Sequence, residues 1–205
     1  MVDRPCTIAF CFSGAVRSFT QPRIHESIKA QLITGGLASQ GCAWDSFFYL
    51  DAEDGGGAGT IFAPAPSSKQ DAAAALASFA PTRVVWHQEG AGVVPNSCTD
   101  GLPDPTSHPQ LWKLAACYRM VEQHEREQGW QYTWVVRARP DTGWLENAPP
   151  VQAFTADRIY VGQPSVWPLN DQFALIPRHL AGVYFSAINS FYACGDGSTG
   201  GSGSE

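Results

Sequence analysis

The sequence TIAFCFS, residues Thr7–Ser13, decides the fold class of this chain. It is a short apolar run that stops at Gly14, which predicts a buried strand ending in a tight loop. Runs of the same kind return at intervals along the chain. They predict further strands at Trp44–Leu50, Arg83–His87, Tyr132–Arg139, Asp157–Gly162 and Phe173–Ile176.

Segments of helical character lie between these strands. In the clearest one, Leu111, Leu114, Tyr118 and Val121 recur at helical spacing, and Gly129 is a suitable terminator. The alternation predicts an α/β layered domain over residues 1–194, with a mostly parallel central sheet flanked by helices. Residues 195–205 are rich in Gly and Ser and predict a flexible tail. We also expect helices at Arg23–Leu37, Lys69–Phe79 and Arg178–Ala193, and a long loop at Gln88–Pro109.

The composition argues against several classes of protein. The 205 residues are 44% hydrophobic, which suffices for a packed core. Thirteen basic and nineteen acidic residues give a net charge of −6, which argues against a nucleic-acid partner. The longest unbroken apolar run, Ala72–Ala77, is too short for a bilayer, so we expect no transmembrane segment. Ten of the thirteen basic residues are Arg, whose planar donors suit phosphate and carboxylate.

The cysteines bear on the cellular compartment. The six, at positions 6, 11, 42, 98, 117 and 194, include no CxxC pair, and several lie in apolar surroundings. The N-terminus lacks the pattern of a signal peptide. We therefore expect reduced thiols in a cytoplasmic protein. The alternative is the Golgi lumen, if an anchor precedes this sequence.

Charged residues lie at the carboxyl end of the fourth predicted strand and just after it, where parallel sheets bind ligands. Arg137, Arg139 and Asp141 alternate, so we expect them on one face, with Asp141 balancing one guanidinium. The other guanidinium would then meet a ligand phosphate, or another acid such as Asp51. The alternative is a structural Arg–Asp pair that ties the strand end to its loop.

The turn after the first strand, SGAVRSF, offers a second anion-binding stretch. Gly14 allows close approach of the backbone, the following amides suit phosphate, and Arg17 adds a cation. The alternative is an ordinary strand–loop–helix turn with Arg17 in solvent. A third polar stretch, Asn170-Asp171-Gln172, precedes the last strand and could be turn chemistry alone.

Other motifs are rejected. Residues 195–200 match GxGxxG, but no strand precedes them and no helix follows. The histidines lack zinc-binding spacing, and no GxSxG elbow is present.

Together, three stretches resemble a GT-A-like glycosyltransferase-type family. They are FSGAVRSF after the first strand, VVRARPDTGW after the long helix and NDQFALIP before the last helix, and the resemblance covers about Thr7–Tyr192. It implies a Rossmann-like GT-A-type fold for nucleotide sugars, with the donor diphosphate near the end of the RARPD strand. It also implies that Asp141 is the last acid of a DxD motif, which holds Mn²⁺ or Mg²⁺ in such enzymes.

The sequence departs from this motif, because Arg139 stands where the first acid is expected. One carboxylate and a diphosphate are a sparse ligand set, so we expect weak or absent dependence on a divalent ion. Arginines could neutralise the leaving group in place of a metal.

The resemblance implies a transferase that moves a sugar from a nucleotide-diphosphate donor to a hydroxyl of a carbohydrate or glycoconjugate acceptor. Asp171 is expected to be the catalytic base. The residues expected at the donor diphosphate are Arg137 and Arg139, with Gly14, Arg17 and Ser18 behind them. Asn170 and Gln172 are expected to bind the sugar hydroxyls of the acceptor.

Two other classes stay open at this point. One is a non-catalytic nucleotide- or carbohydrate-binding module with the same fold, which the missing DxD favours. The other is a structural α/β domain whose arginines meet acidic partners.

Overall fold

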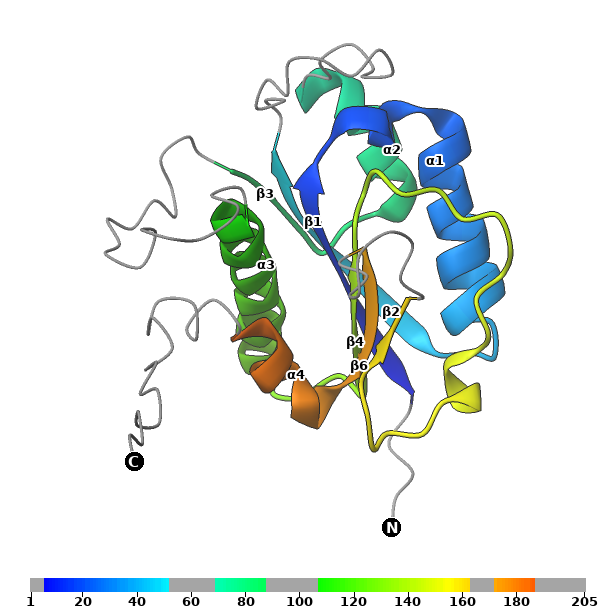
Figure 1. Ribbon diagram of the computed structural model, residues 1–205, viewed down its shortest axis with the longest axis vertical. Helices are drawn as coiled ribbons and strands as arrows, with labels where there is room; N and C mark the ends of the chain where they lie inside the picture. Colours follow the sequence, from blue (N-terminus) through cyan, green and yellow to red (C-terminus); the bar gives the residue numbers. More distant parts are fainter. Residues whose placement is uncertain (1–5, 52–68, 88–106, 163–171, 187–205) are drawn as a thin grey trace, which may run out of the picture.

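The computed structural model describes residues 6–51, 69–87, 107–162 and 172–186 (Figure 1). Their strands form a six-stranded sheet in the order β3-β2-β1-β4-β6-β5. The pairs β3–β2, β2–β1 and β1–β4 are parallel, whereas β6 is antiparallel to both β4 and β5. The strands are β1 Thr7–Ala15, β2 Ala43–Asp51, β3 Arg83–Trp86, β4 Trp134–Ala138, β5 Tyr160–Val161 and β6 Phe173–Pro177.

The predicted α/β class and mostly parallel sheet are confirmed, with two antiparallel pairs at one edge. The reason lies in the connections. Helices link β1 to β2, β2 to β3 and β3 to β4, and such crossovers bring strands back in parallel. Between β4 and β5 the only helical element described is the single turn η4, Val151–Ala153, which is too short for a crossover packed on the sheet.

Helices cover both faces of the sheet (Figure 1). One face packs against α1, η2 and α2, and the other against α3 and α4. Because a strand buried on both faces needs apolar residues at every position, β1 is almost continuously apolar. The helices are α1 Pro22–Ser27, η2 Ile28–Leu37, α2 Lys69–Phe79, α3 Ser107–Gln128 and α4 Arg178–Phe185, with a short 3₁₀ turn η1 at Arg17–Thr20.

Alternate residues of β1 enter two separate cores. Phe10 and Phe12 pack on the α2 side, where the Phe12 ring lies 4.7 Å from that of Phe48. Ala9 and Cys11 pack on the α3 side, with Val121 of α3 in the same cluster. The period-two alternation of a strand therefore fixes which residues meet which helix layer.

Several predicted boundaries change. The helix Lys69–Phe79 is confirmed, whereas the long helix begins at Ser107, inside the segment predicted as a loop. The predicted strand at Asp157–Gly162 shortens to β5 because Asp157 pairs with the adjacent Arg158 in a turn. Residues 88–106 and the tail 195–205 lie outside the described residues, as does the predicted last helix beyond residue 186.

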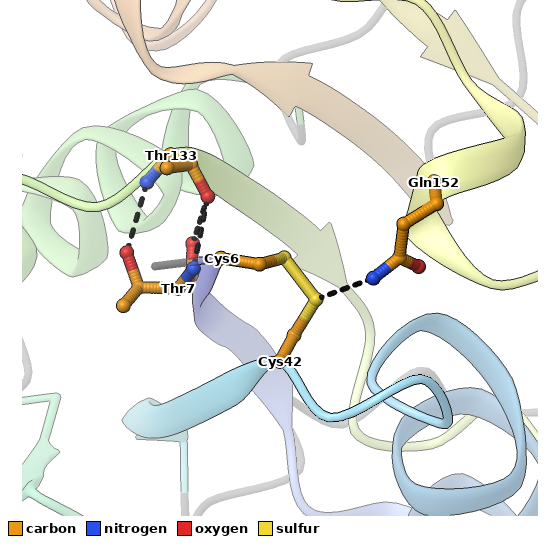
Figure 2. Close-up of a disulfide and its surroundings, with 5 residues drawn as sticks. All are labelled: Cys6, Thr7, Cys42, Thr133 and Gln152. Atoms are coloured by element: carbon orange, nitrogen blue, oxygen red, sulfur yellow. Dashed lines mark hydrogen bonds between the residues drawn. A yellow bond between two sulfur atoms is a disulfide. The ribbon is translucent and has the colours of Figure 1, made fainter. Parts of the chain in front are cut away.

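The prediction of reduced thiols is wrong for four cysteines. Figure 2 shows the disulfide between Cys6 and Cys42, whose Cα atoms lie 4.7 Å apart. The parallel register pairs Thr7 with Ala43, so the residues just before them face each other. A second disulfide joins Cys11 of β1 to Cys117 of α3. Spacing in the sequence could not reveal either pair, because both depend on how the strands and helices assemble.

No helix in the described part of the chain is long and apolar enough to cross a bilayer.

Candidate functional site

The candidate site lies at the carboxyl ends of β1 and β4, where the order of the strands changes direction. From β1 the chain moves outward to β2 and β3, and then returns to place β4 on the other side of β1. The order of the strands therefore reverses at the β1–β4 pair, and ligands of open α/β sheets bind outside the carboxyl ends of the strands at such a reversal. These two loops carry the SGAVRS and RARPD stretches.

Asp141 is the centre of the site. Arg139 Nε donates to Asp141 Oδ1 at 2.9 Å, and Arg139 Nη2 donates to Oδ2 at 2.8 Å. Arg17 Nη1 lies 3.6 Å from the same Oδ2, and Ser18 Oγ donates to the backbone oxygen of Asp141 at 2.9 Å. The two stretches predicted to bind anions thus meet, and two guanidiniums approach one carboxylate.

The turn after β1 has the backbone needed for this meeting. Gly14 has a φ of 141°, a conformation that side chains disfavour, and a Cβ there would lie 3.5 Å from Cδ of Pro140. Arg17 also has a positive φ, of 30°, which is uncommon for a residue with a side chain and concentrates at functional sites. The Val16 amide donates to the Asp51 carbonyl at 3.0 Å and fixes the turn to β2.

The exposure of the two arginines differs. The side chain of Arg17 is 52% exposed, whereas that of Arg139 is 19% exposed and that of Asp141 only 9%. An incoming anion would therefore meet Arg17 first, with Arg139 held behind it by a bidentate pair.

Arg137 lies elsewhere. It is 3% exposed and pairs in register with Cys11 and Ala174, on the sheet face that α3 and α4 cover. Of the three side chains predicted to line up, Arg139 and Asp141 form a bidentate pair. Direct contact between Arg137 and a ligand stays a prediction.

The third predicted stretch is described only in part. The Arg139 amide donates to the Gln172 carbonyl at 3.0 Å, because β4 and β6 are antiparallel and pair Ala138 with Phe173. Gln172 therefore lies next to the Arg139–Asp141 pair. Asn170 and Asp171 fall outside the described residues, and their roles stay predictions.

A second polar cluster lies at the ends of β2 and β3, and of its residues only Asp51 and His87 stand out in the sequence. Lys113 of α3 forms an ion pair with Asp51. The suggested partnership of Asp51 with the Arg pair is thus replaced by a contact with α3. Tyr49 Oη and His87 Nδ1 lie 3.2 Å apart, and both rings contact Trp112 edge-on. Asp51 and His87 each end a predicted strand, but no sequence signal showed that α3 crosses above them.

Burial sets the protonation of this second cluster. It lowers the pKa of His87 and raises the pKa of Tyr49. At neutral pH the imidazole and the phenol are therefore both uncharged. The charged groups of the cluster are Lys113 and Asp51, which form an ion pair.

The residues around Asp141 do not fit a divalent ion. Both carboxylate oxygens already accept hydrogen bonds from Arg139, and Arg17 approaches one of them, so a metal would have to displace a guanidinium. In the described ranges, no three His, Cys, Asp or Glu side chains gather as a possible metal site.

Comparison with known proteins adds one finding. Residues 109–191 match a family described as a domain of unknown function, DUF7796. The matched segment contains β4, the Asp141 loop and β6, but not the turn after β1. No curated protein matches the chain.

Proposed function

We propose that this protein is a glycosyltransferase of the GT-A type, which moves a sugar from a nucleotide-diphosphate donor to a hydroxyl acceptor. The observation that carries the proposal is the meeting of Arg17, Ser18 and Arg139 around Asp141 at the reversal of strand order. In open α/β sheets this is where nucleotides bind. The resemblance of the three motifs to the glycosyltransferase-type family supports the same function.

The reaction needs stabilisation of its leaving group. The acceptor oxygen attacks the anomeric carbon, the bond from that carbon to the diphosphate oxygen breaks, and the nucleoside diphosphate leaves with the bonding electrons. Arg17 and Arg139 would stabilise the charge that develops on the diphosphate, because preorganised cations act strongly where charge appears in the transition state. The acceptor proton would pass to a carboxylate, for which Asp171 is the candidate.

The proposed reaction does not depend on a divalent ion. Arg139 occupies both oxygens of Asp141, the position where the family resemblance implies a metal ligand. Two guanidiniums can supply the positive charge that a metal would bring, and their planar donors match phosphate oxygens.

One observation favours a second candidate, a non-catalytic nucleotide-binding module. Arg139 stands where the family resemblance implies the first acid of a DxD motif, and it occupies both oxygens of Asp141, so the metal ligands of a catalytic member are missing. Such a module would bind the donor and release it unchanged.

Calorimetry with UDP-, GDP- and CMP-sugars, in EDTA, tests the proposal. We expect binding of a UDP- or GDP-sugar, whose diphosphate can contact both arginines, and weaker binding of the monophosphate CMP-sugar. Product analysis with a mixture of glycoside acceptors then separates the candidates. Transfer supports the glycosyltransferase, binding without transfer or hydrolysis shows the module, and no binding of any nucleotide sugar rejects both.

A further inference from the structure

A cavity of about 570 Å³ opens beside the candidate site. Of the residues that line it, only Gln172 belongs to the predicted site. It lies between the loop that follows Asp141, the end of η2 and the start of β6. Its volume is within the range of pockets that bind small molecules, about 300–1,000 Å³. Thr142, which lines the cavity, directly follows Asp141, and Gln172, on the other side, accepts the Arg139 amide.

The wall of this cavity is held rigidly. The loop of residues 142–149 crosses α1 and η2 (Figure 1), where the Trp144 amide donates to Ser27 Oγ and the Ala148 amide donates to the Gln31 carbonyl, both at 3.0 Å. Gly36 of η2 makes the close approach possible, because a Cβ there would lie 3.1 Å from Cβ of Ala148. The cavity is therefore largely formed before any ligand arrives, which lowers the entropic cost of binding.

The lining combines an aromatic wall with a polar rim. The Trp144 ring packs edge-on against Phe173, with centroids 5.2 Å apart, so its orientation is fixed. Glu146 and Asn147, next to Trp144 in the chain, are exposed. Leu145 also lines the cavity and is 97% exposed, so a bound ligand would cover its side chain. Among the described residues that line the cavity there is one carboxylate and no Lys or Arg.

This chemistry favours one class of ligand. A phosphate would find no cation in the lining and would meet Glu146, so the donor diphosphate belongs with Arg17 and Arg139 outside the cavity. A sugar ring has an apolar face of C–H groups, which suits an indole ring, and hydroxyls at its edge, which suit amides and a carboxylate. A fully apolar ligand would cover the polar side chains of Glu146 and Asn147 without offering them hydrogen bonds.

We propose that this cavity binds the sugar ring of a neutral carbohydrate acceptor, with Trp144 as its platform and Asn147 and Gln172 as hydroxyl ligands. The inference rests on the proposed function and specifies its acceptor. Because Thr142 is the chain neighbour of Asp141, a sugar in the cavity would present a hydroxyl next to the donor site.

Saturation-transfer NMR with methyl β-galactoside, methyl β-glucoside, methyl α-mannoside and methyl β-N-acetylglucosaminide tests the proposal. We expect at least one glycoside to bind, and Trp144→Ala to weaken that binding by about tenfold or more. The matched control is Trp130→Ala, which removes another partly exposed indole, 39% exposed, outside this cavity. Asn147→Ala, at an exposed position, provides a second variant if Trp144→Ala does not fold, with the same expected direction.

Nucleotide-sugar binding, measured in parallel, distinguishes the possible failures. We expect Trp144→Ala to leave it unchanged, and Arg139→Ala to weaken it while glycoside binding persists. If nucleotide sugars bind but no glycoside does, the acceptor site is wrong and the proposed function stands. The same conclusion follows if the glycoside binds the Trp144 and Asn147 variants as tightly as the wild type. If glycosides bind through Trp144 but no nucleotide sugar binds, the proposed function fails and the cavity is not an acceptor site. Tight binding of an uncharged apolar probe, Nile red, in place of every glycoside also overturns the inference.

Discussion

Removal of the Cys6–Cys42 disulfide tests how the starts of β1 and β2 are held together. The bond connects residues 36 apart in the sequence and therefore closes the chain segment that contains α1 and η2. In the chain-entropy account, a cross-link of this separation destabilises the unfolded chain by about 4 kcal/mol at 25 °C. For a domain of this size, that free energy corresponds to a fall in Tm of roughly 8–15 °C.

The assay is urea unfolding of Cys6→Ser, Cys42→Ser and the double variant, with the wild type kept oxidised. We expect similar losses in all three, because either single change breaks the bond. Gln152→Ala is the matched control, since it removes only the hydrogen bond from Gln152 Nε2 to Cys42 Sγ, 3.1 Å long, and should cost about 1 kcal/mol. An oxidised wild type no more stable than the double variant would refute the reasoning, as would alkylation of both cysteines in the native protein.

Three further predictions concern single side chains. Glu125→Ala breaks a buried pair with Arg178 and should lower the unfolding free energy, measured in urea, by about 3–5 kcal/mol. Glu127→Ala breaks an exposed pair with Arg83 and should cost far less, so equal losses would contradict this prediction. Burial lowers the pKa of His87 in the folded protein, so the unfolded state binds the proton more readily. The unfolding free energy should therefore decrease as the pH falls through 6.5, the ordinary pKa of the imidazole. His87→Gln should reduce this pH dependence, and an unchanged pH profile in the variant would contradict the prediction. Asp171→Asn should keep folding and donor affinity while single-turnover transfer falls by about 10²–10⁴, and normal turnover would leave Asp171 a turn residue.

Much of the fold follows from local sequence patterns. Residues 8–12 and 47–50 are apolar on both faces, and the helices between strands make the parallel arrangement predictable. The antiparallel edge was not predictable, because β5 has only the two residues Tyr160 and Val161 and nothing local sets its direction. The disulfides were missed for a related reason: Cys6 and Cys42 become neighbours only through the register of β1 and β2.

The candidate site was predictable as far as it depends on strand ends. Arg139 ends a predicted strand, Arg17 and Asp141 each lie in the loop after one, and parallel strands bring such residues to one edge of the sheet. Partnerships across layers were not predictable. The contact of Asp51 with Lys113 depends on where α3 crosses the sheet, and the cavity beside Trp144 depends on how the loop after Asp141 packs on η2.

The most direct test of the central claim compares nucleotide-sugar affinity in two arginine variants, by calorimetry in EDTA. Arg139→Ala removes the guanidinium proposed to hold the diphosphate, and Arg158→Ala removes one from a bidentate pair of similar geometry with Asp157 on the surface. If Arg139 holds the diphosphate, Arg139→Ala should lower donor affinity by about 10- to 100-fold, as expected for charge-assisted hydrogen bonds. Arg158→Ala should leave donor affinity unchanged. A folded Arg139→Ala protein that binds the donor as tightly as the wild type would contradict the claim.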